Sequence, residues 1–326
     1  MKTQKGLVSI LTPAYNASQY IHRLLESVLM QDYPEIEMIV IDDGSTDNTM
    51  EVIRSFASKF QERGYSITYE TQDNAGQSMA INNGLKYVNG AYLIWPDSDD
   101  FFRLSNSISK MVMALDYTDD SYGMVRCRNQ FIEEGTLSDL TGGFRYTNEE
   151  SLFLPFINGE EFGGGAGIYM VKTAALDKVI PCRDIYTGRR PQNCQLLEPL
   201  FYSYKCKTLN ERLINILVRT DSHSHEEKPY DGQLDDIQGY IDIHTNTLKR
   251  MTNLPAKELE NYIQIVNLRF LNDKLALALN YNKCSDVRKF AKEIKRCGGN
   301  ISLRKRAKIL MSYCPPMLRL LSWFMK

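Results

Sequence analysis

Three aspartates, Asp97, Asp99 and Asp100, stand within four residues of one another, directly after the apolar run YLIWP at residues 92–96. Adjacent carboxylates repel one another, so a protein that keeps them ionised normally supplies a cation. Oxygen-only ligand sets suit Mg²⁺ or Mn²⁺, which retain several waters and also bind phosphate oxygens. An ion held here would neutralise a diphosphate leaving group. Taken alone, the motif DSDD is also typical of a solvated turn that caps a helix.

The segments around this motif alternate between strands and helices. Apolar runs predict strands at residues 7–13, 37–45, 66–72 and 90–96. Helical periodicity predicts helices at residues 16–31, 46–64 and 76–88, the first capped by Asn16 or Ser18 and the second opened by Thr46 or Asp47. Most of the strands lack polar alternation, which indicates an α/β fold with a mostly parallel sheet flanked by helices.

Polar residues gather where three of these strands end, at residues 12–16, 42–45 and 97–100. In open α/β sheets, ligands bind in the crevice outside the carboxyl ends of the strands. The three aspartates are therefore expected to line such a crevice.

The composition is that of an ordinary soluble globular protein, and 326 residues suit one main domain with an appendage. The formal net charge of -1 hides an asymmetry, because residues 283–326 carry twelve Lys or Arg against two acidic residues. The acidic balance of the remainder argues against nucleic-acid binding. No signal peptide and no spanning apolar segment is evident, so a cytoplasmic location is expected.

Seven cysteines lie along the chain, and none forms a close CxxC pair. Their odd number and wide spacing argue against both a zinc ribbon and a disulfide framework. Most of them are expected to fill the core.

The segments VSILTPAYNASQYIHRLLESVLMQDYPEIEMIVIDDGSTDNT and DNAGQSMAINNGLKYVNGAYLIWPDSDDFF resemble, in this order, the family 2 glycosyltransferases of the GT-A fold. The resemblance covers about residues 7 to 102, a third of the chain. It implies a Rossmann-like sheet and an inverting enzyme that uses nucleotide-sugars, most often UDP-sugars, with Mn²⁺ or Mg²⁺.

The resemblance also assigns roles to residues. Tyr15 would stack on the base, with Pro13 beside it, and Asp43 or its neighbour Asp42 would hydrogen-bond the base. Asp97 and Asp99 match the family's Asp-x-Asp, the first contacting the ribose or the metal and the second being the firmest metal ligand. The expected donor-binding residues are Pro13, Tyr15, Asp42, Asp43, Asn74, Gln77, Asp97 and Ser98.

A neutral planar base binds well against an aromatic ring and beside a carboxylate that accepts its N–H, and a diphosphate binds well beside a cation. The three polar clusters at the strand ends offer these groups, so the residues themselves agree with the resemblance. Taken singly, Tyr15 is also compatible with a packing tyrosine, and Asp43 with a helix cap.

The sequence departs from the family pattern at two places. Ile81 stands where an arginine is common, so any role of that arginine is absent or relocated. The family's Glu-Asp pair, whose aspartate is the catalytic base, falls on Gln192 and Asn193, and an amide cannot take a proton from the acceptor hydroxyl.

Another carboxylate would therefore have to act as the catalytic base. Glu198 is the first choice, because an ionisable group inside LLEPLF must be paired or useful. The competing prediction is that Pro199 breaks the helix and leaves Glu198 in solvent. Asp184 is the second choice.

For the metal, Asp97, Asp99 and His223 are the expected ligands. His223 and His225 lie where family members often place a histidine near the metal or the diphosphate, and Asp221 is a rival. Each of these is also compatible with a solvated loop residue.

Beyond residue 105 the pattern is less regular, and from about residue 231 it is helical throughout. We expect a glycosyltransferase domain over residues 1–230, with nucleotide-sugar binding in 1–105 and the acceptor side in 106–230. A helical region would follow over 231–326. Its basic amphipathic end, which includes Leu318 and Trp323, is expected to touch the cytoplasmic membrane face or else to pack on the domain.

The expected function is transfer of a sugar from a nucleotide-sugar to a saccharide or lipid-linked acceptor during surface polysaccharide or glycan synthesis. Gln192 and Asn193 favour an alternative, a nucleotide-sugar-binding protein without catalysis. A nucleotidyltransferase, which also needs paired aspartates and a metal, is a third option and would release pyrophosphate.

Overall fold

The computed structural model describes residues 3–141, 146–147, 149–160, 165–188, 193–219 and 228–311. Within these residues the strands form one eight-stranded sheet in the order β3-β2-β1-β4-β7-β6-β8-β5. The strands are β1 (Gln4–Ala14), β2 (Ile36–Asp42), β3 (Ser66–Thr71), β4 (Gly90–Ile94), β5 (Phe101–Phe102), β6 (Tyr122–Glu133), β7 (Tyr169–Lys172) and β8 (Lys205–Val218).

The half of the sheet built from the first hundred residues is parallel. Strand β1 pairs in parallel with β2 and β4, and β2 pairs in parallel with β3. Strands β1 and β2 are buried along most of their length, which explains their continuous apolar sequences. The expected α/β fold with a mostly parallel sheet is confirmed in this half.

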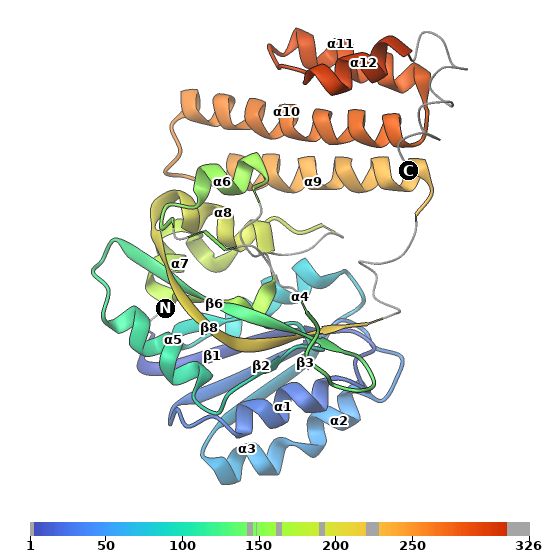
Figure 1. Ribbon diagram of the computed structural model, residues 1–326. Helices are drawn as coiled ribbons and strands as arrows, with labels where there is room; N and C mark the ends of the chain where they lie inside the picture. Colours follow the sequence, from blue (N-terminus) through green and yellow to red (C-terminus); the bar gives the residue numbers. More distant parts are fainter. Residues whose placement is uncertain are drawn as a thin grey trace.

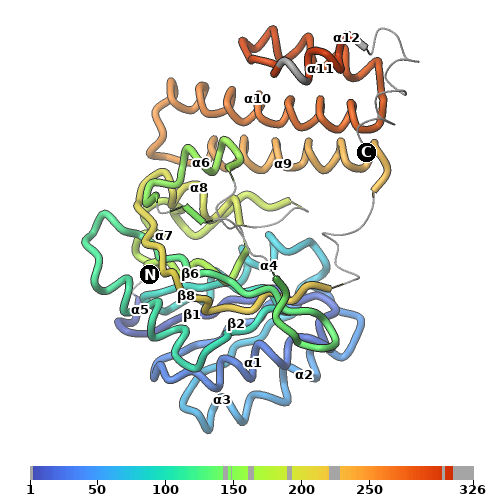
Figure 2. Tube along the Cα trace, in the orientation of Figure 1, coloured from blue at the N-terminus to red at the C-terminus, as the bar shows by residue number. Residues whose placement is uncertain are grey.

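Antiparallel pairs enter in the second half, where β7 lies between β4 and β6 and runs against both. The long strand β8 returns in parallel beside β6 (Figure 2). The short β5 pairs antiparallel with β8. This return matters for the site, because β8 carries its last residues to the edge where β1, β2 and β4 end.

Helices cover both faces of the sheet. The helices α1, α2 and α3 lie on one face, whereas α4 and α8 lie on the other (Figure 1). The helices of this part are α1 (Ile21–Leu29), α2 (Thr49–Ser55), α3 (Ala57–Arg63), α4 (Gln77–Gly84), α5 (Ser107–Asp116), α6 (Phe153–Asn158), α7 (Thr173–Val179) and α8 (Asn193–Ser203), with 3-10 turns at Leu85–Tyr87, Ala166–Ile168 and Pro181–Arg183.

Two helix boundaries differ from expectation. Helix α1 begins at Ile21 rather than after Asn16 or Ser18, because Asn16 has a left-handed φ of 48° and both residues bond to the loop at 45–47. The single helix expected at residues 46–64 is two helices, α2 and α3, separated at Phe56.

The helical pattern expected from residue 231 is confirmed up to residue 311. It forms α9 (Tyr230–Arg250), α10 (Ala256–Asn280), α11 (Cys284–Arg296) and α12 (Leu303–Met311), which stack outward from α8 in successive layers (Figure 1). The main core continues into the first two of these helices through Leu248, Val266 and Phe270. A second, smaller core joins α10 to α11 and includes Leu275 and Phe290. Residues 312–326, with Leu318 and Trp323, lie outside the described residues.

The sequence-based expectations about membrane-spanning segments and about the cysteines can be compared with the described structure. In the part that the structure describes, no helix combines the length and apolar character that a membrane crossing requires. The cysteines of that part are free thiols, and Cys127 and Cys206 are buried in the main core. Cys314 lies outside the described residues.

Candidate active site

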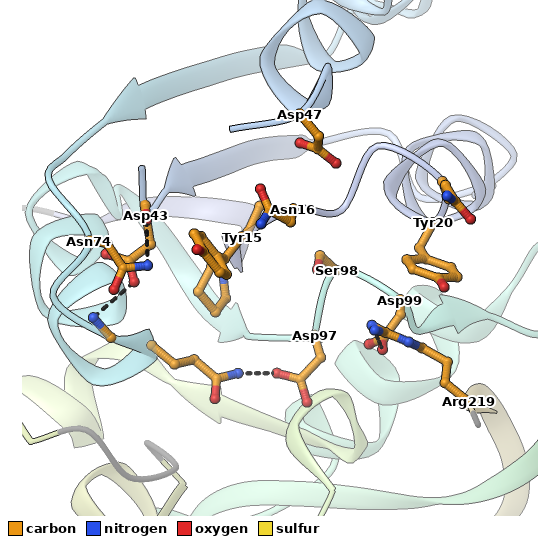
Figure 3. Close-up of a pocket in the computed structure, with 15 residues that line it drawn as sticks. Tyr15, Asn16, Tyr20, Asp43, Asp47, Asn74, Asp97, Ser98, Asp99 and Arg219 are labelled. Carbon is orange, nitrogen blue, oxygen red and sulfur yellow. Dashed lines mark hydrogen bonds and ion pairs between the residues drawn. The ribbon is translucent and has the colours of Figure 1, made fainter. Parts of the chain in front are cut away.

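A cavity of about 790 Å³ opens at the edge of the sheet where β1, β2 and β4 end. The loops after these strands, the start of α4 and the end of β8 all contribute to it (Figure 3). Its lining is Pro13, Ala14, Tyr15, Asn16, Gln19, Tyr20, Asp43, Asp47, Asn74, Gly76, Gln77, Asp97, Ser98, Asp99 and Arg219. The structure thus brings together most of the residues expected from the sequence to bind the donor.

Asp43 anchors the loop between β3 and α4. One carboxylate oxygen, Oδ1, accepts hydrogen bonds from Gln72 Nε2 (2.7 Å) and the Ala75 backbone N–H (2.9 Å), and Oδ2 accepts one from the Gly76 N–H (2.8 Å). Asn74 Nδ2 donates to the Asp43 carbonyl oxygen at 3.0 Å. Charge-assisted bonds of this kind are among the stronger ones in proteins, so the loop is fixed against the end of β2.

Gly44 permits the close approach of these two loops. Its φ is +74°, and a Cβ at this position would lie 2.9 Å from the Asn74 backbone nitrogen. Any other residue would be strained there and would push the Asn74 loop away.

Asp42, the alternative to Asp43, does not line the cavity. It is the last residue of β2, its side chain is buried, and Oδ1 accepts a hydrogen bond from the Ser45 N–H at 3.3 Å. Successive side chains of a strand point to opposite sides, so only one of the two adjacent aspartates can face the ligand. The expectation of Asp42 as a donor-binding residue finds no support in this placement.

The three aspartates after β4 have different surroundings. Asp97 Oδ1 accepts a hydrogen bond from Gln77 Nε2 at 2.5 Å, and Asp99 Oδ2 lies 3.1 Å from Arg219 Nη1 in a partly exposed ion pair. Figure 3 shows Arg219 reaching over Asp99, with Tyr20 close by; the guanidinium lies 4.3 Å from the centre of the Tyr20 ring.

Asp100 does not line the cavity, contrary to the expectation that all three aspartates would do so. It is buried, and its Oδ1 accepts a hydrogen bond from the Leu217 N–H of β8 at 3.3 Å. Burial raises the pKa of Asp100 well above its ordinary value, and the charges of Asp99 and Asp97 add to this rise. Asp100 therefore ties the aspartate loop to β8, and only Asp97 and Asp99 of these three aspartates line the cavity.

The donor set of the cavity fits a hard divalent cation. Asp97 and Asp99 offer carboxylate oxygens, and Mg²⁺ or Mn²⁺ is commonly held by one or two carboxylates together with waters and substrate phosphates. Within the described ranges, no group of three or more His, Cys, Asp or Glu side chains is placed to hold a metal ion. His223, His225 and Asp221 lie outside the described residues, so the expected histidine ligand is not placed.

Tyr15 presents a half-exposed ring to the cavity, as the base-stacking role requires. The loop that carries it is fixed by its neighbour, because Asn16 Oδ1 accepts a hydrogen bond from the Thr46 N–H (2.9 Å) and the Asn16 N–H donates to Ser45 Oγ (2.9 Å). The ends of β1 and β2 are thus joined beside the cavity.

Sequence reasoning missed several lining residues, chiefly Tyr20 and Arg219. Arg219 follows β8, 120 positions after Asp99, and no local pattern joins the two. Asp47 was expected only as a helix opener; it accepts hydrogen bonds from the Ser18 and Thr49 N–H groups (3.1 and 3.0 Å) and lines the cavity as well.

Both departures from the family pattern are visible in the fold. Ile81 is fully buried in the core, so the position where an arginine is common offers no charge to the cavity. Asn193 begins α8, and its Oδ1 accepts a hydrogen bond from Trp95 Nε1 at 3.0 Å, which places it against the end of β4. Gln192 lies outside the described residues.

Glu198, the first candidate for the base, does not line the cavity. Helix α8 continues through Pro199, so the prediction that this proline breaks the helix and exposes Glu198 is wrong. The Glu198 carboxylate is fully buried, and Oε2 lies 3.4 Å from Nδ1 of His244 on α9. The two groups are close enough for an ion pair, but they are not oriented for a hydrogen bond.

Asp184, the second candidate, is 64% exposed and forms an ion pair with Arg250 (Oδ2 to Nη1, 3.3 Å). Its Oδ1 accepts a longer hydrogen bond, 3.4 Å, from Nδ2 of Asn82 on α4. Asp184 lines a different, smaller cavity next to α8 and α9. Neither candidate faces the larger cavity in this conformation, and the identity of the base stays a prediction.

The sequence was compared with protein families and with curated proteins. Residues 9–178, just over half of the chain, match the family model described as glycosyl transferase family 2. The putative teichuronic acid biosynthesis glycosyltransferase TuaG of Bacillus subtilis is 41% identical over 103 residues, which make up 32% of this chain and 40% of that protein. The matched segment covers at most 40% of the length of the first curated relatives, TuaG among them.

Solved structures show the same fold over nearly the whole chain. The S. aureus protein TarS, solved in complex with UDP-GlcNAc, aligns with 94% of this chain and 89% of its own at a TM-score of 0.63 and 17% identity. The mannosyltransferase PcManGT from Pyrobaculum calidifontis, solved with GDP-Man and Mn²⁺, aligns with 99% of this chain and 89% of its own at a TM-score of 0.53 and 16% identity. At these identities the likeness shows the fold alone, and that fold is GT-A.

The family match includes the ends of β1, β2 and β4 at the cavity, and the described structure has the fold that the sequence motifs imply. The chain belongs to glycosyl transferase family 2.

Proposed function

We propose that the chain is a glycosyltransferase that binds a nucleotide-sugar, namely a UDP-sugar, in the larger cavity and transfers the sugar to a saccharide or lipid-linked acceptor with inversion. The observation that carries this proposal is the meeting of three groups at one sheet edge: the Tyr15 ring, the Asp43 carboxylate and the Asp97–Asp99 pair. The name of TuaG, a putative teichuronic acid biosynthesis glycosyltransferase, supports a role in surface polysaccharide biosynthesis, and the complex of TarS with UDP-GlcNAc supports a UDP-sugar as the donor.

The donor would lie across the cavity with its base beside β2. Tyr15 would stack on the base, with Pro13 behind it, and Asn74 would hold the base end of the cavity. An ionised carboxylate can accept about four hydrogen bonds, and Asp43 receives three from the protein, so one acceptor position is left for an N–H of the base. A uracil N–H fits that position.

The diphosphate would lie beside Asp97, Ser98 and Asp99 at the opposite end. Asp99, with Asp97, would hold the divalent cation, which when bound neutralises charge on the leaving diphosphate. Gln77 orients Asp97 through its 2.5 Å hydrogen bond. Arg219 would exchange its contact with Asp99 for one with a phosphate, supplying a cation that Ile81 cannot.

The proton of the acceptor hydroxyl needs a base other than Asn193. Asp184 is the better placed of the two candidates because it is exposed, whereas Glu198 has no surface that an acceptor could touch. A movement of the segment at 184–188, which contacts α4 through Asn82 and Ser78, would be needed to bring Asp184 to the donor.

A thermal-shift panel of UDP-, GDP- and nucleoside monophosphate-linked sugars with Mn²⁺ tests the donor class. We expect UDP-sugars to raise the melting temperature most, because ligands that bind only the native state stabilise it by mass action. The stabilising donor is then incubated with Mn²⁺, with and without candidate acceptors, and release of the nucleoside diphosphate is measured.

Two outcomes would contradict the proposal. Donor binding without any sugar release, even with acceptors present, would favour a nucleotide-sugar-binding protein, the alternative suggested by Asn193. Release of pyrophosphate would favour a nucleotidyltransferase.

We further propose that residues 1–230 form the glycosyltransferase domain and that the helical region from 231 to 326 brings it to the cytoplasmic membrane face. Helix α12 carries exposed Arg306 and Leu310, with Lys305 and Lys308 half-buried beside them. Each basic residue near an anionic surface contributes about 1 kcal/mol of binding free energy.

Deletion of residues 303–326 should leave the rest folded but abolish co-sedimentation with phosphatidylglycerol vesicles. A deletion variant that still binds these vesicles would show that the basic end is not the membrane contact.

A further inference from the structure

A second cavity, of about 340 Å³, lies between the segment at 179–186, helix α8 and the end of α9. Residues that line it include Ile180, Tyr186, Gln195, Pro199, Thr247 and Met251. None of its lining residues belongs to the larger cavity among the described residues. It is therefore a separate site, built partly by the C-terminal helices.

Two polar side chains of this cavity are buried and lack hydrogen-bond partners within the described residues. Both amide atoms of Gln195, a residue only 2% exposed, are unpaired. Oγ1 of Thr247, 3% exposed, is also unpaired. In native proteins nearly all buried polar groups have a hydrogen-bond partner. Each exception therefore indicates that a water or a bound ligand is the partner.

The remaining lining decides what kind of ligand fits. Ile180, Pro199 and Met251 present apolar surface, and Tyr186 adds an aromatic ring. At the rim, Arg250 is already paired with Asp184. The cavity therefore has a largely apolar lining, with the unpaired amide of Gln195 and hydroxyl of Thr247 buried in its wall and no unpaired charge among these groups.

This combination matches a sugar ring better than its competitors. An amide donates and accepts at once, so it can bond two neighbouring hydroxyls, while the C–H face of the ring covers apolar or aromatic surface. A lipid chain would leave Gln195 and Thr247 unpaired, and a nucleotide would need more volume and a free cation.

We propose that this second cavity binds a single neutral sugar ring of a glycan, with Gln195 and Thr247 as its hydrogen-bond partners. The cavity adjoins the first turns of α8, the helix whose first residue, Asn193, contacts Trp95 after the end of β4. If the bound glycan is the acceptor of the transfer reaction, that part of the proposal rests on the proposed function. Binding of the ring itself does not depend on the transfer activity.

Met251 provides a direct probe of this cavity. The full chain is labelled with ¹³C-methyl methionine, and the Met251 signal is assigned among the thirteen methionines with a Met251→Leu variant. Methyl glycosides of glucose, galactose, mannose, rhamnose and N-acetylglucosamine are titrated to about 100 mM, well above the millimolar constants of weak ligands. We expect at least one of them to move the Met251 signal to saturation.

Gln195→Leu should weaken that binding about tenfold, the scale of one or two lost hydrogen bonds. The variant should remain folded, because leucine has a similar size and removes two unpaired buried atoms. Thr247→Val serves as a second variant for the same reason. Gln238→Leu is the matched control, since Gln238 is exposed on α9 and does not line the cavity; it should leave binding unchanged.

Three results would overturn the proposal: no glycoside moves the Met251 signal, a glycoside binds Gln195→Leu as well as the unaltered chain, or 1-hexanol moves the signal while the glycosides do not. The first, combined with an unchanged or higher melting temperature of Gln195→Leu, would show that the cavity holds only buried water. UDP binding with Mn²⁺ is measured in parallel, so a failure of the larger cavity is distinguished from a failure of this one.

Discussion

The cavity at the sheet edge and the interface between α8 and α9 both hold carboxylates, but the two regions surround them differently. At the sheet edge, Asp43 accepts three hydrogen bonds, Asp97 accepts one from Gln77, and Asp99 faces Arg219. Between the helices and within the described residues, His244 alone lies at ion-pair distance from Glu198, and neither Glu198 oxygen has a hydrogen bond there.

The difference follows from secondary structure. Loops after strands expose backbone N–H groups, as Ala75 and Gly76 show, and these groups donate hydrogen bonds to a carboxylate without another charged side chain. Inside a helix the backbone groups are already bonded to one another, so Glu198 depends on side chains from α9. Carboxylates at strand ends are thus held by the backbone beside a cavity, whereas the buried Glu198 is affected by the charged side chains of His244 and Arg269.

The largest test of this contrast is Asp99→Ala. We expect UDP binding in Mn²⁺ to weaken about 100-fold or more, because a metal ion at a phosphate is worth several kcal/mol. In EDTA the loss should be small, since the carboxylate then has no cation to hold. Equal losses in the two conditions, measured by calorimetric titration, would show that Asp99 does not act through a metal.

A second test sets the two candidate bases against each other, one exposed and one buried. If Asp184 takes the proton, Asp184→Asn should lower turnover about 100-fold with donor affinity intact, the scale of general-base catalysis. Glu198→Gln should then alter stability more than turnover. The reverse result would assign the base to Glu198, and near-normal turnover in both would exclude both.

A third test uses the charge state of the buried pair. Burial alone lowers the pKa of His244, but the neighbouring Cys194 and Glu198 outweigh it and raise that pKa to about 10. Burial raises the pKa of Glu198 as well, partly offset by His244 and Arg269. The folded chain therefore binds protons here more tightly than the unfolded chain, and the stabilisation is complete below the ordinary histidine pKa and is lost as the pH rises through about 10.

We expect the unfolding free energy of the chain to fall by on the order of 4 kcal/mol between pH 6.5 and 10. Urea unfolding over this range is compared with the double variant Glu198→Leu and His244→Leu, which keeps apolar packing and removes both titrating groups. Parallel pH profiles for the two proteins would mean that the pair does not carry the proton.

The smallest expected effect is at Arg219. Its ion pair with Asp99 is partly exposed, so Arg219→Ala should tighten binding of Mn²⁺ alone by about threefold to fivefold, because the metal no longer competes with the guanidinium. The same variant should weaken UDP-sugar binding. Arg219→Lys, which keeps the charge, should show both effects less strongly. Weaker Mn²⁺ binding in Arg219→Ala would contradict the proposal that Arg219 exchanges its contact with Asp99 for one with a phosphate.

The sheet-edge residues could be predicted from the sequence because they follow their strands directly. Each strand is recognisable from its apolar run, and within three residues of the end of such a run lie Tyr15, Asp43, Asp97 and Asp99. The choice between Asp42 and Asp43 could not be made, since it depends on which residue of the strand end turns toward the ligand.

Contacts between distant segments were beyond sequence reasoning. Arg219 meets Asp99 only because β8 returns beside β6, and Gln195 lies near Thr247 only because α9 packs on α8. The choice between a buried and an exposed Glu198 was left open by the sequence, because a proline normally ends a helix, yet α8 accommodates Pro199 among packed neighbours.

The bonds from Asp43 to the loop at 72–76 have a consequence for binding rates and affinities. Because folding itself orders this loop against Gly44, the base end of the cavity is preorganised before any nucleotide arrives. Little conformational entropy is then lost on association, and more of the contact energy appears as affinity. The base end should behave as a rigid receptor, so nucleoside recognition should tolerate changes in the sugar far better than changes in the base.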